Sequence, residues 1–149
     1  MKITDIYREK NLQKKSVISL EVFPPKTDAG IETIYQTVAG LTHKPDYISV
    51  TYGAMGSLGR ENKTLEIAEK IKKEYGIETM HHLTSINNNP EQITEILAEI
   101  KAKNVQNILA LRGDLPKNTD INACAASHHY AHARTTANKK TAEAHKPAH

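Results

Sequence analysis

The stretch 89–111, NPEQITEILAEIKAKNVQNILAL, decides the fold class because it contains one complete helix followed by one strand. Its first residue is an asparagine, a preferred N-cap, while Pro90 suits the first helical position and Gln92 stands at the capping-box position. Apolar residues then recur at helical spacing as far as Ile100. The short apolar run Asn107–Leu111 is typical of a buried strand. The pattern predicts a helix that leads directly into a strand.

The same unit recurs toward the N-terminus. Strands are predicted over residues 16–23, 46–51 and 77–83, with helical spacing of apolar residues between them. The four strand centres are 29 to 32 residues apart and lie near Ile18, Ile48, Met80 and Leu109. A repeat of this size is that of a βαβ unit with parallel strands. The fold class is therefore α/β, either an open doubly wound sheet or a (β/α)8 barrel.

Length and charge exclude several classes of protein. The chain has 149 residues, a net charge of +3 and a single cysteine, Cys124. We expect one domain, no intrachain disulfide and no preference for nucleic acid. No stretch approaches the roughly 18 apolar residues of a membrane span, and Met1–Lys15 lacks the apolar core of a signal peptide. A cytoplasmic protein without a membrane partner is the expectation.

The last part of the chain has a different composition. Residues 121–149 contain nine Ala and five of the eight His, with one Ile and no Leu, Val, Met or Phe. We therefore predict a structured part, 1–118, and an Ala/His-rich tail, 119–149, that has few core residues. A cysteine and three histidines of the tail resemble a zinc set, but their spacing matches no established finger, so no metal site is predicted. These residues are Cys124, His128, His129 and His132.

Polar side chains follow every predicted strand. They lie in the stretches 21–25, 51–57, 82–85 and 112–114. Because ligands of parallel α/β folds bind at the carboxyl ends of the strands, we expect a functional site there.

Individual residues of these stretches keep alternative interpretations. Glu21, at the end of an apolar strand, is expected to be partly desolvated and suited to general acid catalysis, or else to be a structural partner of a Lys or Arg. His81 and His82 are adjacent on a strand and point to opposite faces, so one faces the interior, as a ligand contact or as a hydrogen-bonded core residue. The two glycines of Thr51–Ser57 predict either close backbone approach to a ligand or a plain turn.

Four motifs together resemble the bacterial methylenetetrahydrofolate reductase family. They are Ser19–Thr27 (SLEVFPPKT), Ile48–Ser57 (ISVTYGAMGS), His82–Thr84 (HLT) and Ile108–Pro116 (ILALRGDLP). Their order and spacing match, and the resemblance covers roughly residues 1–118. The sequence departs from the family pattern at Val22, Met55 and Ser85, where Phe, Gly and Cys are common.

The resemblance implies a flavoprotein built on a (β/α)8 barrel. Such an enzyme uses NADH or NADPH, through FAD, to reduce 5,10-methylenetetrahydrofolate to 5-methyltetrahydrofolate for methionine synthesis. Glu21 matches the general acid that protonates folate N10, and Asp114 matches the carboxylate beside flavin and folate. The positions that match cofactor contacts are Thr51, Tyr52, Ala54, His82, Arg112, Gly113 and Asp114.

Length limits what the resemblance implies for this chain. Eight βα units need ~240 residues, whereas only four strands are predicted here, so we expect a truncated barrel followed by an unrelated tail. The alternative function is a non-catalytic half-barrel that acts as a weak binding or self-assembling module. Two copies could close a barrel between them, which leaves a homo-oligomer as an open alternative.

Overall fold

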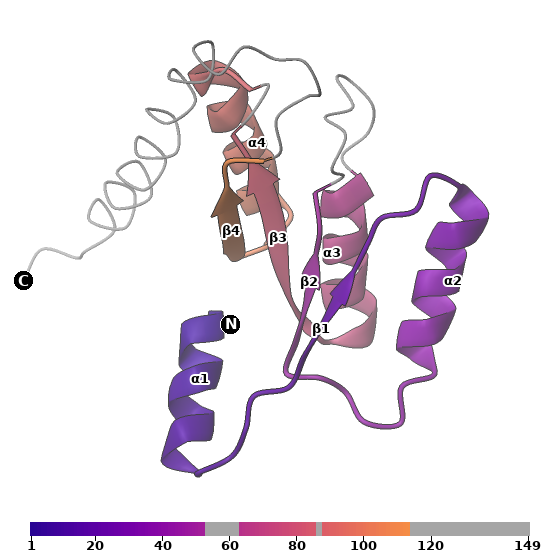
Figure 1. Ribbon diagram of the computed structural model, residues 1–149, viewed down its shortest axis with the longest axis vertical. Coiled ribbons are helices and arrows are strands. Elements are labelled where there is room, and N and C mark those ends of the chain that lie inside the picture. The colour runs from indigo at the N-terminus through magenta and orange to yellow at the C-terminus, as the bar shows by residue number, and fades with distance from the viewer. Residues whose placement is uncertain (53–62, 86–87, 114–149) are drawn as a thin grey trace, which may run out of the picture.

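The computed structural model describes residues 1–52, 63–85 and 88–113. They contain a four-stranded parallel sheet, with the strands side by side in chain order (Figure 1). The strands are β1 (Ser19–Val22), β2 (Tyr47–Val50), β3 (Glu78–Thr84) and β4 (Asn107–Leu111). The predicted α/β class is confirmed. β4 has the predicted bounds, β2 and β3 agree within one residue at each end, and β1 is shorter than the predicted 16–23.

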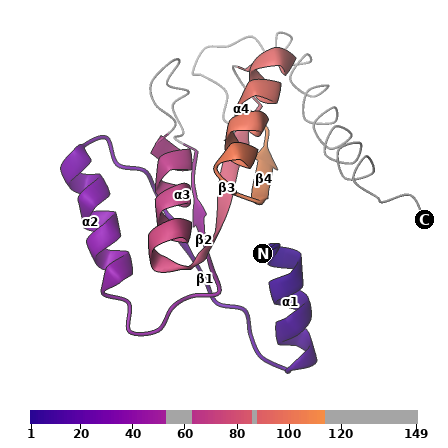
Figure 2. The same cartoon turned by 180° about the vertical axis from the view of Figure 1, so that it is seen from behind.

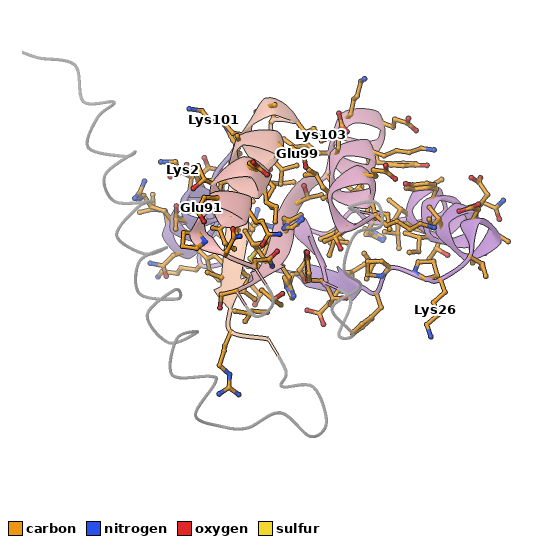
Figure 3. The ribbon with its side chains drawn as sticks, turned by 90° about the horizontal axis from the view of Figure 1, so that it is seen from above. Lys2, Lys26, Glu91, Glu99, Lys101 and Lys103 are labelled. Carbon is orange, nitrogen blue, oxygen red and sulfur yellow. The ribbon has the colours of Figure 1, made fainter. Side chains whose placement is uncertain are left out.

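Three helices connect the strands and cover one face of the sheet. They are α2 (Asp28–Ala39), α3 (Lys63–Tyr75) and α4 (Pro90–Ala102). Seen from above, they form an arc on one side of the strands (Figure 3). A doubly wound sheet would have helices on both faces and a reversal in strand order. Sequential strands with all three connecting helices on one side are instead the arrangement of consecutive units of a (β/α)8 barrel.

Local signals in the sequence set the helix ends. The Asn89 side chain accepts a hydrogen bond from the Gln92 backbone N–H, and the Gln92 side chain accepts one from the Asn89 N–H, both at 2.8 Å. This reciprocal pair is the predicted capping box at the start of α4. Gly76, directly after α3, has φ +65°, a left-handed conformation that favours glycine. The predicted start of α4 is confirmed.

A further helix, α1 (Ile3–Leu12), was not predicted from the sequence. It lies below the amino ends of β3 and β4 in the view of Figure 2. The amino-terminal ammonium lies 2.6 Å from Glu78 Oε2, and the Ile3 N–H donates to Asn107 Oδ1 at 2.8 Å. Lys10 forms an ion pair with Asp46 at 2.8 Å. These contacts fix α1 at the amino ends of the strands.

The strand register sorts the side chains into two sets. Glu21 pairs with Ser49, and Ser49 pairs with Met80, so these side chains share one face of the sheet. We call this face the interior side, and the face covered by α2, α3 and α4 the helix side. The buried core lies on the helix side, where Ile48 and Val50 are completely buried. Polar residues at the strand ends can therefore gather on the interior side without disturbing the core.

Candidate functional site at the carboxyl ends of the strands

Three polar side chains from three neighbouring strands meet on the interior side. The Ser49 hydroxyl, on β2, lies 3.3 Å from Glu21 Oε2 on β1. His82 Nε2, on β3, lies 3.7 Å from the same carboxylate oxygen. The parallel register explains the meeting, since Glu21 and Ser49 are paired and His82 is two residues beyond the partner of Ser49. We call these three residues the Glu21 cluster.

The imidazole of His82 is desolvated. The residue is only 7% exposed, and Nε2 has no hydrogen-bond partner among the described residues. Burial lowers the pKa of His82, while the negative charge of Glu21 opposes this by raising it. His82 is therefore neutral near pH 7, with a ring nitrogen directed toward the cluster.

Glu21 is half-exposed. Its side chain is 45% exposed in the described part of the chain, and its predicted desolvation stays a prediction. The exposure follows from its position on β1, a strand at the sheet edge, and on the interior side, which none of the connecting helices covers. The carboxylate contacts the Ser49 hydroxyl on β2 and lies beside His82 on β3.

His81 lies on the other side of the sheet and has a different environment. It is completely buried on the helix side, with its ring 6.2 Å from the ring of Tyr52 in an edge-to-face arrangement. The prediction that His81 and His82 point to opposite faces is confirmed. Tyr52 packs against the core. Thr51 is half-buried, and its backbone carbonyl accepts a hydrogen bond from the Thr64 hydroxyl at 3.0 Å, which ties the end of β2 to α3.

The end of β4 brings a cation and a flexible backbone to the same edge of the sheet. Arg112 is exposed, and Gly113 has φ +89°, a conformation that L residues rarely adopt. Ser85, at the end of β3, is buried, and its backbone N–H donates to the Leu111 carbonyl at 2.9 Å. Its hydroxyl lies 3.4 Å from the Arg112 carbonyl. Ser85 thus ties the segment carrying Arg112 to β3.

Two of the predicted site residues, Ala54 and Asp114, lie outside the described residues. The Cys and His residues of the tail, for which no metal site was predicted, lie outside them as well. Within residues 1–52, 63–85 and 88–113, no group of three or more His, Cys, Asp or Glu side chains could hold a metal ion.

Sequence reasoning missed Ser49 and the contacts of Ser85. A signal for Ser49 was present, because it is the one aliphatic hydroxyl in the strand Tyr47–Val50 and alternates with the core residues Ile48 and Val50. Its partner could not be read from the sequence, because that contact depends on the register between β1 and β2.

The fold and the site define the class of protein: an α/β protein of barrel type, with a polar site at the carboxyl ends of its parallel strands. A family model described as methylenetetrahydrofolate reductase matches residues 4–136. The chain belongs to the methylenetetrahydrofolate reductase family, an oxidoreductase family. The match extends past residue 118, and the division into 1–118 and 119–149 stays a prediction.

Individual relatives agree with the family. A "Probable methylenetetrahydrofolate reductase (NADH)" from Oryza sativa is 38% identical over 121 residues, which are 80% of this chain and 20% of the relative. The "5,10-methylenetetrahydrofolate reductase" of Pectobacterium carotovorum is 39% identical over 107 residues, 71% of this chain and 35% of that protein. The Escherichia coli protein of the same name is 37% identical over 100 residues, which are 66% of this chain and 33% of that protein. The chain thus spans about a fifth to a third of these relatives.

In the described part of the chain, none of the helices combines the length and apolarity that crossing a bilayer requires.

Proposed function

We propose that this chain carries part of the active site of an enzyme that reduces 5,10-methylenetetrahydrofolate to 5-methyltetrahydrofolate. The observation that carries the proposal is the Glu21 cluster, in which an exposed carboxylate lies beside a buried histidine and a buried serine at the carboxyl end of the sheet. Membership of the family supports the reaction, and the NADH in the names of several relatives supports a nicotinamide reductant. We further propose a cytoplasmic location, since folate reduction uses soluble substrates.

Glu21 is the proposed general acid. Protonation of the folate N10 by its carboxyl group would open the five-membered ring to a cationic iminium, which then accepts a hydride at carbon. Exposure of the carboxylate on the interior side supports this role, because the group must reach a substrate. Asp114, outside the described residues, is proposed as the second carboxylate, whose fixed negative charge favours the cation.

The residues at this edge suit FAD, which supplies hydride transfer when bound. His82 Nε2, buried on the interior side without a hydrogen-bond partner among the described residues, can hydrogen-bond a polar ring. The exposed Arg112 guanidinium and the open backbone at Gly113 fit a phosphate-bearing group. Thr51, Tyr52, Ala54 and Asp114 are proposed to complete the contacts, with NADH or NADPH as the reductant.

The absorption spectrum of the purified protein tests this function. Added FAD should remain bound through gel filtration, and NADH or NADPH should bleach its visible band anaerobically. Addition of 5,10-methylenetetrahydrofolate should then restore the band. A colourless protein after loading, or a bleached band that the folate does not restore, would contradict the proposal and favour the alternative of a non-catalytic, self-assembling half-barrel.

Glu21→Gln separates the two half-reactions. We expect flavin bleaching by NADH to remain and the rate of reoxidation by the folate to fall by a factor of about 10² to 10⁴, the usual contribution of a general acid. Glu91→Gln is the matched control, since Glu91 is an exposed carboxylate in the first turn of α4 (Figure 3) and is not one of the residues of the cluster. Equal loss of both half-reactions in Glu21→Gln would argue against its role as the acid.

A further inference from the structure

Ser49 occupies the centre of the Glu21 cluster, and the family resemblance gave it no role. It is 6% exposed, and its hydroxyl lies 3.3 Å from two acceptors, Glu21 Oε2 and the Leu20 carbonyl oxygen. Both distances exceed the usual 2.7–2.8 Å for an O–H···O bond. A hydroxyl with one proton and two neighbouring acceptors alternates between them.

The carboxylate of Glu21 uses its two oxygens unequally. Both of its contacts with described residues, to Ser49 and to His82, run through Oε2. Oε1 is therefore the oxygen that remains for another ligand. A half-exposed glutamate without an anchor samples several rotamers, and its distance from His82 would vary accordingly.

We propose that Ser49 is a positioning residue that holds Glu21 Oε2 beside His82 and leaves Oε1 to face the substrate. When Glu21 is ionised, the Ser49 hydroxyl donates to Oε2. When Glu21 is protonated, the same hydroxyl donates to the Leu20 carbonyl and its oxygen can accept the carboxyl proton. The anchor thus persists in both protonation states. The importance of Ser49 for catalysis rests on the proposed function, whereas its positioning of Glu21 does not.

Titration of His82 by NMR in the 149-residue chain reports the positioning directly. The charge of Glu21 raises the pKa of His82 against the effect of burial, and Glu21 is the only described charge that does so. Ser49→Ala should release the carboxylate, so the midpoint of His82 should move to lower pH, in the same direction as in Glu21→Gln. Ser49→Thr retains a hydroxyl and should keep the midpoint near the wild-type value.

Thr79→Val is the matched control. The Thr79 hydroxyl is also buried, but it donates to the Ala68 carbonyl at 3.2 Å on the helix side. Its loss should leave the His82 midpoint unchanged. If Ser49→Ala does not fold, Ser49→Cys, with a similar volume and a weaker donor, should shift the midpoint in the same direction by a smaller amount. An unchanged midpoint in the folded Ser49 variants, together with a shifted one in Glu21→Gln, would overturn the positioning role.

Kinetics of the FAD-loaded protein test the consequence for catalysis. Ser49→Ala should slow flavin reoxidation by the folate on the order of 10-fold, through kcat more than KM, and leave reduction by NADH unchanged. The pH profile of the folate step should shift relative to wild type, and Ser49→Thr should recover most of the rate. If wild type itself does not reduce the folate, the proposed function fails, while the titration of His82 still decides the role of Ser49. An unchanged folate step in an active Ser49→Ala enzyme would contradict its importance for catalysis.

Discussion

Two neighbouring histidines of β3 lie on opposite faces of the sheet and have different environments. His81 lies on the helix side, completely buried beside the core, whereas His82 lies on the interior side, with Nε2 directed toward the exposed carboxylate of Glu21. The difference is a single residue along β3. A parallel strand can therefore contribute to stability with one set of alternating residues and to a polar site with the other.

The largest expected effect is on the free energy of unfolding, and it compares an apolar residue on the helix side with one on the interior side. Ile48→Ala, at a completely buried position of the helix side, should lower the free energy of unfolding by about 2–5 kcal/mol. Leu109→Ala, on the interior side and 37% exposed, should cost less, about 1–2 kcal/mol, because more than a third of the residue stays in water. Urea unfolding followed by circular dichroism measures both. Equal costs would show that the interior side is covered as thoroughly as the core.

The second effect concerns the amino ends of the strands, where the N-terminus contacts Glu78 on β3. Glu78 accepts the amino-terminal ammonium at 2.6 Å and forms an ion pair with Lys72 at 2.9 Å. Glu78→Gln should cost about 1–3 kcal/mol, the usual value of hydrogen bonds to a charged group. Glu95→Gln, at an exposed position of α4, is the control and should change stability by less than ~0.5 kcal/mol.

The pH dependence of this second effect has a defined sign. Burial raises the pKa of Glu78, but the hydrogen bonds from the N-terminus and Lys72 together outweigh it, so the pKa is lowered below 4.5, the ordinary value of a glutamate. The stabilisation is therefore present above about pH 4.5 and is lost as the pH falls through the folded-state pKa. Urea midpoints of wild type and Glu78→Gln should converge in acid. A constant difference would contradict the ionic origin of the contact.

The smallest effect belongs to His82. Its pKa is lowered by burial despite the charge of Glu21, so the unfolded chain takes up a proton before the folded one does. Stability should therefore fall as the pH drops below about 6.5, the value of an unperturbed histidine, and should level off below the folded-state pKa. His82→Gln should reduce this dependence, and His43→Gln, at an exposed position, should not. The same slope in His82→Gln and wild type would place the titrating group elsewhere.

Much of the fold could be predicted because its signals are local. The capping box at Asn89 depends on a few neighbouring residues, and it is confirmed. α1 was missed because its sequence, ITDIYREKNL, buries only Ile6 and has a weak apolar pattern. Its stability comes from contacts distant in sequence, such as those of the N-terminus with Glu78 and of Lys10 with Asp46.

The sequence predicted which residues lie at the strand ends, whereas the contacts between them depend on the register of the strands. The positions of Glu21, His82 and Arg112 at strand ends followed from the sequence, and their roles in the reaction stay predictions. Exposure of Glu21 could not be foreseen, because it depends on which face the helices cover and on where β1 stands in the sheet. The anchor supplied by Ser49 likewise required the pairing of β1 with β2.

The sequence by itself determined the alternation of strands and helices, the opposite orientations of His81 and His82, and the family, because periodicity and motifs are properties of short segments. Only the tertiary structure decided that the three connecting helices share one face, that α1 meets the amino ends of the strands, and that Ser49 and His82 converge on one oxygen of Glu21. These features depend on contacts between segments about 30 to 100 residues apart in the chain, whose geometry is fixed only when the strands are paired.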